Sequence, residues 1–373
     1  MKNKRFRTSA WVLAVVMTLS TFTVGCGEQK SSTKTTSQST SNVQNNNGTR
    51  SVTNLDGSTV VVPNKVNKIA VTFGPAYEKV VLLGDEDKIV ADGDYHINGW
   101  PWSNKIYKRL NQVHGIPNVH SKLNVEELMK YKPDVVFHFS KPDEIQKIND
   151  AKMVGIPSVS TGKLEDTKNM VTFYAKVLGK KEEKIAEEYS KYFDEKLKMV
   201  TDITSQISDN EKPTVYFASQ KLLWTSGKGS DIPEVINLAG GKCVNKDVKG
   251  ANQAQVGIEQ LIQWNPQYIF VDHAGSSGNE PAESVIKKMI NDDRYKKISA
   301  VANNKVYIVP TGVFFWDSGV QKILMVMWMA KQLHPDKFKD LDMTKEVKQF
   351  YSKFFKYNLT DEETKKILDH LNP

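Results

Sequence analysis

The sequence predicts an α/β protein of two lobes, each with a central, mostly parallel sheet flanked by helices, joined by a long rigid spine helix. Three observations predict this fold. Short apolar runs alternate with helical patterns over residues 51–165, which is typical of βαβ units. Residues 166–210 have helical periodicity with one glycine, Gly179, which indicates a break. The alternation then restarts over residues 211–373, so we expect a second lobe similar to the first.

The N-terminal lobe is predicted from five consecutive segments. "KIAVTF" (68–73) is typical of a buried strand, and "GPAYEKVVLLG" (74–84) predicts a helix after a Gly-Pro turn. "DKIVADG" (87–93) predicts the next strand. "NVEELMKYKPDVVFHFS" (124–140) predicts a helix, a stop at the proline and a buried strand, and residues 142–162 predict another helix and strand.

The C-terminal lobe follows the same order. "KPTVYFAS" (212–219) predicts a strand, and residues 230–241 predict a helix that ends at a glycine pair. "GIEQLIQWNPQYIFVDH" (257–273) repeats the earlier pattern of a helix with an acid near its start, a proline stop, and a strand that ends in histidine. Residues 304–310 predict a further strand, and the apolar stretch 318–335 predicts a core helix.

The first fifty residues predict export and anchoring. Basic residues precede the apolar run "WVLAVVMTLSTFTV", which indicates a signal peptide over residues 1–25. "TVGC" resembles a lipobox, although Thr23 stands where leucine is usual, so we expect Cys26 to be lipidated. Residues 26–50 are rich in Ser, Thr, Asn and Gln and predict a disordered tether. We therefore expect a lipid-anchored protein on the extracellular face of a Gram-positive-type membrane.

Charge and cysteine content exclude several classes of protein. The formal charge is +8, and four of these positive charges lie in the predicted signal peptide. No basic helix or aromatic-basic repeat indicates nucleic-acid binding. The chain has two cysteines, Cys26 and Cys243, so the predicted folded part cannot contain an internal disulfide. We expect a monomer that has no nucleic-acid partner.

No sequence pattern for catalysis or for a resident cofactor is present. The chain lacks a nucleophile elbow, a Walker loop and an HExxH motif, and its seven histidines are scattered. We therefore predict that the protein is not an enzyme and needs no cofactor. "SGKGS" (226–230) predicts a tight turn, and backbone amides at such a turn can face an anion.

Aromatic and polar residues follow several predicted strands at their carboxyl ends. Ligands bind outside these ends in open α/β sheets. Loops are usually polar, so aromatic residues gathered there predict the walls of a shared cleft. The predicted ligand-binding residues are Phe73, Tyr77, His96, Trp100, Trp102, His138, Gln220, Trp224, His273, Phe315 and Trp316.

At this point the chain resembles the class III substrate-binding proteins of ABC importers, which bind ferric siderophores, haem, cobalamin and related metal complexes. The resemblance covers residues 51–373 and rests on the paired "NVEELMKYKPDVVF" and "GIEQLIQWNPQYIF" segments, the "WTSGKGS" turn and "FFWDSG…WMAKQLHPDKF". It implies two lobes joined by a rigid helix, and docking onto a permease and its ATPase through one acid per lobe. By their positions these acids are Glu126 and Glu259.

The ligand stays open between several chemistries. We expect an iron-siderophore or similar metal chelate in the cleft, with His96 completing the coordination of the bound metal. The alternatives are cobalamin or haem, or a molybdate-type oxyanion at the "TSGKGS" amides. Two other classes are also considered: an extracellular enzyme on a doubly wound scaffold, against which the missing catalytic motif counts, and an envelope adhesion lipoprotein, against which the absence of repeats counts.

Overall fold

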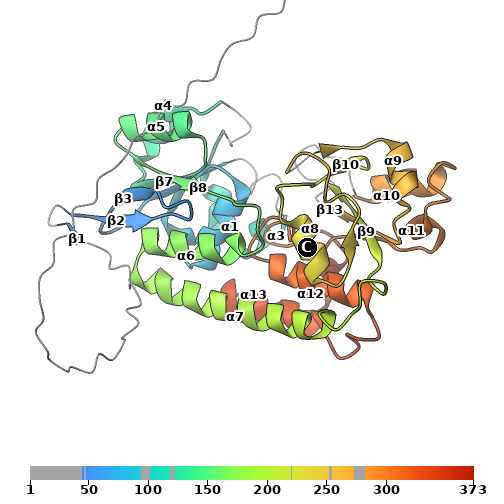
Figure 1. Ribbon diagram of the computed structural model, residues 1–373. Coiled ribbons are helices and arrows are strands. Elements are labelled where there is room, and N and C mark those ends of the chain that lie inside the picture. Colours follow the sequence, from blue (N-terminus) through green and yellow to red (C-terminus); the bar gives the residue numbers. More distant parts are fainter. Residues whose placement is uncertain are drawn as a thin grey trace, which may run out of the picture. The chain divides into compact units, whose positions relative to one another are not determined.

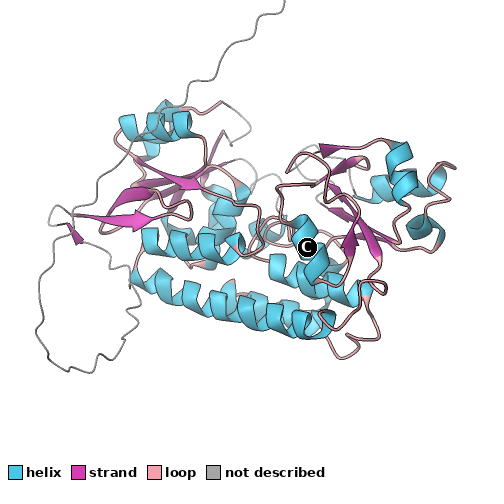
Figure 2. Cartoon of the chain, viewed as in Figure 1, coloured by secondary structure: helices cyan, strands magenta, loops and turns pink. Residues whose placement is uncertain are grey.

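The computed structural model describes residues 44–45, 48–93, 101–117, 122–219, 221–251, 254–272 and 282–373. Residues 42–373 form one compact unit. Within it Figures 1 and 2 show two lobes, each with helices packed around a sheet, as the sequence predicts. The long helix α7 extends beneath both lobes in Figure 1.

The N-terminal lobe is built on a five-stranded parallel sheet with the strand order β6-β5-β4-β7-β8. The first strand of the chain in this sheet, β4, is central, and every one of its residues is buried. The strands are β4 (Ile69–Val71), β5 (Ile89–Gly93), β6 (His114–Ile116), β7 (Val135–Phe139) and β8 (Val154–Ser158). Its helices are α1 (Gly74–Leu82), η1 (Glu86–Lys88), α3 (Pro101–Ile106), η2 (Lys108–Gln112), α4 (Val125–Tyr131) and α5 (Pro142–Asp150).

The short apolar run at residues 59–63 does not join this sheet. It forms β3 (Thr59–Pro63) of a separate antiparallel sheet with β1 (Gln44–Asn45) and β2 (Thr49–Thr53). Arg50 of β2 fixes this sheet against the end of α6 (Asp166–Leu178), because its guanidinium donates to the carbonyl oxygens of Lys176 and Val177 at 3.0 and 2.7 Å.

The C-terminal lobe contains a mixed six-stranded sheet. Strands β9, β13, β14 and β11 are mutually parallel, whereas β10 and β12 add an antiparallel edge. The strands are β9 (Thr214–Ser219), β10 (Trp224–Thr225), β11 (Lys242–Cys243), β12 (Ala254–Gln255), β13 (Tyr268–Asp272) and β14 (Val306–Ile308). The helices are α8 (Ile232–Leu238), α9 (Ile258–Trp264), α10 (Ala282–Asn291), α11 (Ser299–Ala302), α12 (Lys322–Leu333), α13 (Met343–Phe354) and α14 (Asp361–Leu368).

The stretch predicted as the spine is a pair of helices, divided at Gly179, where the sequence predicts a break. Helix α6 ends at Leu178, and the 25-residue helix α7 (Lys180–Thr204) begins after Gly179, whose φ of 151° is rarely adopted by other residues. Helix α7 contacts α6 and also α8 and α12 of the C-terminal lobe. Tyr189 of α7 also donates a hydrogen bond to the carbonyl oxygen of Val320 at 2.7 Å, so α7 braces both lobes.

The main hydrophobic core is continuous between the lobes. It joins residues of β4 and α1 to residues of α6, α7, α12 and α13. Smaller clusters lie beneath the outer helices of each lobe. The predicted apolar helix 318–335 corresponds to α12, whose Met and Trp side chains pack in this core.

Candidate functional site

A cavity of about 420 Å³ lies where elements of the two lobes meet. Most of its wall comes from the ends of β7 and β8, from the loops that follow β4, β8 and β10, and from the starts of α1, α6, α8 and α12. The lining residues are Phe73, Pro75, Lys79, Phe139, Ser158, Val159, Ser160, Gly162, Asp166, Thr167, Met170, Ser226, Gly229, Ser230, Asp231, Ile232, Ala251, Asp317, Ser318 and Lys322.

An aromatic pair forms part of the N-terminal wall. Phe73 lies two residues after the end of the short strand β4, at the N-cap of α1, and Phe139 ends the neighbouring strand β7. Their rings meet edge to face, with centroids 5.9 Å apart and planes at 88°. Phe73 is buried but Phe139 is 48 % exposed, so the pair offers an accessible apolar surface to a ligand.

The predicted "SGKGS" turn contributes three residues of the opposite wall: Ser226, Gly229 and Ser230. The turn is held by backbone hydrogen bonds from the amides of residues 227 and 228 to the carbonyl oxygens of residues 250 and 248, at 3.1 and 2.7 Å. The buried Asn245 also donates to the carbonyl oxygen of Ser226 at 2.8 Å. The turn is therefore a fixed part of the wall.

Two glycines bring the lobes into contact at the cavity. A Cβ atom added to Gly162 would lie 2.5 Å from the carbonyl oxygen of Gly229, so neither loop could approach as closely with a larger residue at 162. Nearby, the amide of Leu164 donates to Oε2 of Glu234 in α8 at 2.8 Å. These contacts close one side of the cavity.

Three aspartates and two lysines line the cavity. Asp166 is engaged by its own loop, because it accepts from Ser160 Oγ at 3.1 Å and from the amide and hydroxyl of Thr161 at 2.5 and 2.9 Å. Asp231 forms an ion pair with Lys322. Burial lowers the pKa of Lys79 to about 8, while Glu78 beside it favours the charged form.

Three helices of nine or more residues begin at the cavity: α1, α6 and α12. The first amides of a helix carry partial positive charge and lack partners within the helix. In α6 and α12 the first amides, of Asp166 and Lys322, donate instead to the loop carbonyl oxygens of Lys163 and Gly319 at 3.1 and 3.2 Å, so these helices act on the cavity through their dipoles.

A buried carboxylate joins the lobes below the cavity. Glu78 of α1 accepts from the amide of Val320 at 2.5 Å and from Nε2 of Gln321 at 2.8 Å. Gln321 Oε1 in turn accepts from Trp316 Nε1 and the Tyr351 hydroxyl, at 3.1 and 2.8 Å. Burial raises the pKa of Glu78 to about 7, against these hydrogen bonds, which lower it.

Four of the predicted aromatic ligand-binding residues lie in the core and not in the lining of this cavity. Tyr77 is fully buried, and its hydroxyl is hydrogen-bonded to Ser103. Trp102 donates to the carbonyl oxygen of Leu371 at 2.8 Å, and Trp316 is held by Gln321. Phe315 is buried against Phe314, with centroids 5.3 Å apart. The loop of Phe315 and Trp316 faces the cavity with Asp317 and Ser318 instead.

Two other predicted ligand-binding residues also lie outside the lining. His138 is buried, with Nδ1 2.8 Å from Thr72 Oγ1 and Nε2 2.6 Å from Glu144 Oε2. Burial lowers its pKa, while Glu144 opposes this effect. Trp224 lies in β10 beneath the ammonium of Lys221, which is 4.4 Å from the ring centroid. Of the predicted ligand-binding residues that the structure describes, Phe73 alone belongs to this lining.

Some predicted residues lie outside the described ranges. These are His96, which was also predicted to contact a bound metal, together with Trp100, Gln220, His273 and the predicted lipidation site Cys26.

The two predicted docking acids occupy matching positions. Glu126 is the second residue of α4, and Glu259 is the second residue of α9; both are exposed. Each helix has seven residues and ends at a left-handed residue, Lys132 (φ 49°) or Asn265 (φ 42°), before a proline. The sequence repeat is therefore also a repeat of local structure.

Sequence reasoning missed most of the polar lining. Its list of binding residues emphasised aromatic residues, whereas the cavity receives hydroxyls from "SVSTG" (158–162) after β8 and lysines from α1 and α12. Residues 158–162 lie at the end of a predicted strand, and this position could have indicated that they line the cavity. Nothing in the local pattern of Lys79 or Lys322 indicates a cavity.

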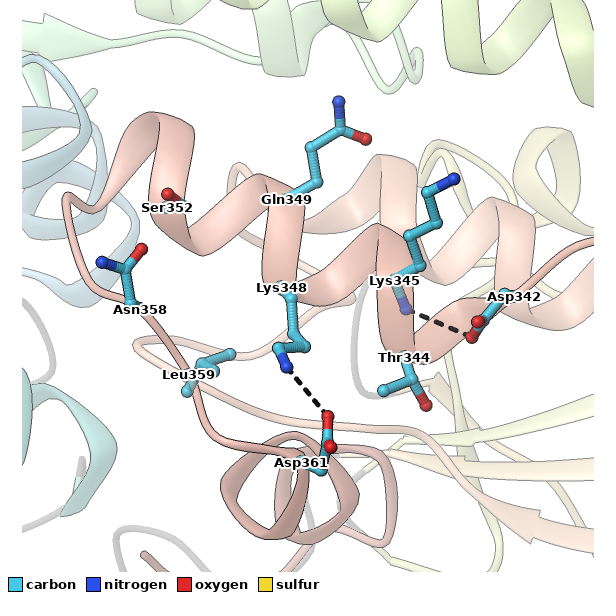
Figure 3. A pocket seen from close by; sticks show the side chains of 9 residues that line it. All are labelled: Asp342, Thr344, Lys345, Lys348, Gln349, Ser352, Asn358, Leu359 and Asp361. Carbon is cyan, nitrogen blue, oxygen red and sulfur yellow. Dashed lines mark hydrogen bonds and ion pairs between the residues drawn. The ribbon is translucent and has the colours of Figure 1, made fainter.

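A second hollow, of about 600 Å³, lies on the C-terminal helices (Figure 3). Its lining comes entirely from residues 342–361, chiefly from α13 and the segment before α14. Figure 3 shows the ion pair from Lys348 to Asp361, at 2.8 Å, across this hollow. This hollow is built from one local segment, whereas the first cavity is lined by residues of both lobes.

Comparison with known proteins identifies the class. Residues 69–311 match the family described as periplasmic binding protein, and the chain belongs to that family. It is a solute-binding protein of an ABC importer, acts outside the cytoplasm on a small solute, and is not an enzyme, which confirms the predicted class. Among the described residues, none of the helices has the length and apolar character required to span a membrane.

Particular relatives cover most of the chain. The molybdate-binding protein MolA of Haemophilus influenzae is 26 % identical over 328 residues, which are 80 % of this chain and 88 % of the relative. A periplasmic solute-binding protein from Veillonella parvula is 27 % identical with a TM-score of 0.70, covering 86 % of this chain and 97 % of the other. The structure of MolA with molybdate has 23 % identity and a TM-score of 0.71 over 83 % and 99 % of the two chains, and shares the fold.

Proposed function

We propose that this solute-binding protein captures a small tetrahedral oxyanion of the molybdate type between its lobes and delivers it to the importer permease. The observation that carries the proposal is the convergence of three helix starts and the Ser226–Ser230 turn on one cavity. The positive ends of helix dipoles and the dipoles of hydroxyl groups favour an anion without a cationic side chain for every charge. The similarity to MolA supports the same chemistry.

The charged groups of the cavity are compatible with a compact anion. Asp166 is held by four donors of its own loop, from Ser160, Thr161 and Lys163, and Asp231 is paired with Lys322. Lys79, whose ammonium donates to the carbonyl oxygen of Pro75 at 3.0 Å, is left to balance the charges of Asp317 and the ligand. The described lining contains no arginine. The three described arginines bind elsewhere: Arg50 to α6, Arg109 to the carbonyl of Ile89, and Arg294 to Asp292. A bulky polyanionic catecholate would lack its usual bidentate partners here.

A metal chelate, including an iron-siderophore, is the second candidate. The accessible Phe73–Phe139 pair and the cavity volume of about 420 Å³ favour it, because a four-oxygen anion would displace only a few of roughly a dozen waters that such a volume holds. The same pair could contact the flat face of an aromatic chelator.

Calorimetric titration separates these candidates. We expect molybdate to bind the purified protein at one site, and Lys322→Met to weaken binding at least tenfold, because it leaves Asp231 facing the anion without its cation. Lys345→Met, in the hollow of Figure 3, is the matched control and should leave affinity unchanged. Saturable binding of a ferric catecholate or haem with no molybdate heat would overturn the oxyanion assignment in favour of the chelate.

Anchoring and docking complete the proposed role. Removal of residues 1–25 and lipidation of Cys26 would hold the protein at the membrane through the tether 26–50. The limits of the lobes, 51–165 and 211–373, with the spine over 166–210, remain those predicted from the sequence. Glu126 and Glu259 would then contact basic residues of the permease, one in each half of the docking surface.

A further inference from the structure

The two helices that carry the docking acids share a second surface feature. Met129 of α4 is 48 % exposed and Ile262 of α9 is 39 % exposed. A single exposed apolar side chain is common on a protein surface, so what matters here is that the two occupy matching positions of two matching helices. The described residues include six exposed large apolar side chains, namely Val61, Met129, Phe139, Ile262, Ile290 and Leu371.

The spacing places each apolar residue beside its acid. Met129 follows Glu126 by three positions, and Ile262 follows Glu259 by three, so each pair lies on one face of its helix. In each helix a leucine lies between the acid and the apolar residue in sequence, and this leucine, Leu128 or Leu261, is buried. Both helices therefore turn the same face toward their lobe. Figure 1 shows α4 and α9 in the upper part of their lobes, on the side away from α7.

Both acids are available to a partner. In α4 the other acid, Glu127, forms an ion pair with Lys130, with an Oε2–Nζ distance of 2.6 Å. Glu126 forms no hydrogen bond or ion pair with another described residue. In α9 Glu259 is the one charged residue of the helix. Arg294, a nearby cation, is held by two oxygens of Asp292, with Nε–Oδ1 and Nη2–Oδ2 distances of 3.0 and 2.6 Å, so Glu259 also lacks an ion-pair partner among the described residues.

We propose that Met129 and Ile262 are the apolar anchors of permease docking, each entering a hollow beside the cation that receives the neighbouring acid. This rests on the proposed docking role of Glu126 and Glu259. A partner that fits must present the same combination of cation and apolar hollow twice, as two copies of one permease subunit would. The acids steer and orient the encounter, and the apolar residues supply affinity by burial.

The test compares three variants of the full chain on its cognate permease–ATPase complex in nanodiscs. We expect Met129→Ser with Ile262→Ser to weaken docking about tenfold or more while its dependence on ionic strength stays that of the unsubstituted chain. Glu126→Ala with Glu259→Ala should weaken docking and also flatten the salt dependence. Ile290→Ser is the matched control, because Ile290 is 51 % exposed on α10, a helix that carries neither docking acid.

The outcomes separate the two levels of the proposal. Thermal unfolding and molybdate titration of each variant check that the fold and the cavity are intact. Docking that is lost with the glutamates but unchanged in the Met129/Ile262 variant would overturn the apolar anchors and leave the docking acids in place. Docking unchanged in both double variants would overturn the docking role of α4 and α9 altogether, and equal weakening by Ile290→Ser would show a non-specific apolar effect and also overturn the anchors.

Discussion

Among single residues, Glu78 combines the least favourable environment with the clearest structural role. It is fully buried and joins α1 to the segment before α12 through hydrogen bonds to Val320 and Gln321. Burial raises its pKa from 4.5 to about 7, although these two hydrogen bonds and the ammonium of the adjacent Lys79 favour the ionised form. Asp317 adds a like charge that raises the pKa further. The fold therefore holds a carboxylate whose ionisation it opposes.

Stability should depend on pH through this residue. The unfolded chain releases the Glu78 proton near pH 4.5 and the folded protein near pH 7, so the folded state binds more protons between these values. The contribution of Glu78 to stability is thus present below about pH 4.5 and is lost as the pH rises through about 7, by roughly 3 kcal/mol. Glu78→Gln should remove this decline while lowering stability overall, because one of its two donors loses an acceptor.

Urea unfolding at pH 5, 6, 7 and 8 measures the effect. The variant and the unsubstituted protein should differ most at pH 5 and least at pH 8. Parallel curves across this range would mean that Glu78 does not titrate between pH 4.5 and 7.

At the level of elements, the break between α6 and α7 depends on one residue. Gly179 has φ of 151°, and a Cβ atom there would meet Glu182 Oε2 at 3.0 Å. Both neighbours are helical, so the chain changes direction within this one peptide. A single continuous helix over 166–210 would not pack against both the N-terminal lobe and α12.

Gly179→Ala should therefore destabilise the protein by about 1–2 kcal/mol, because a side chain is strained in this backbone conformation. Chemical unfolding monitored by circular dichroism measures the change. Lys180→Ala is the adjacent control and should alter stability by less than about 0.5 kcal/mol, since Lys180 is exposed at a helix start. Equal stability of Gly179→Ala and the unsubstituted protein would show that the break is not conformationally required.

In the molecule as a whole, contacts between the lobes set the size of the cavity. Gly162 lies against Gly229, and Leu164 donates to Glu234 of the other lobe at 2.8 Å. The continuous core and α7 hold the lobes from the opposite side. Opening of the cavity on this side therefore requires these peripheral contacts to break.

Glu234→Ala should accelerate ligand release severalfold, because it removes a charge-assisted hydrogen bond between the lobes. The association rate should change little, since the cavity lining is unaltered. Stopped-flow displacement of bound molybdate, or of the ferric chelate if that binds, gives both rates. Glu283→Ala, an exposed first-turn acid of α10, is the control. An unchanged release rate would show that this contact does not hold the cavity closed.

The sequence predicted much of the fold because its signals are local. Apolar runs, the proline stops at Pro133 and Pro266, and Gly179 each specify backbone geometry within a few residues. The candidate site was predicted less well. Strand-end position alone does not say whether an aromatic side chain turns outward or into the core, and Tyr77, Trp102 and Trp316 all turn inward because burial of large rings is favourable.

The sequence by itself determined the α/β alternation, the repeat of α4 and β7 in α9 and β13, the class of protein and the turn at Ser226–Ser230. Only the tertiary structure decided which groups share the cavity. Lys79 and Lys322 are far apart in the chain and reach the same wall because α1 and α12 begin side by side through the Glu78 contacts. Local propensity acts over a few residues, whereas the environment of a charged group is set by segments that only folding brings together.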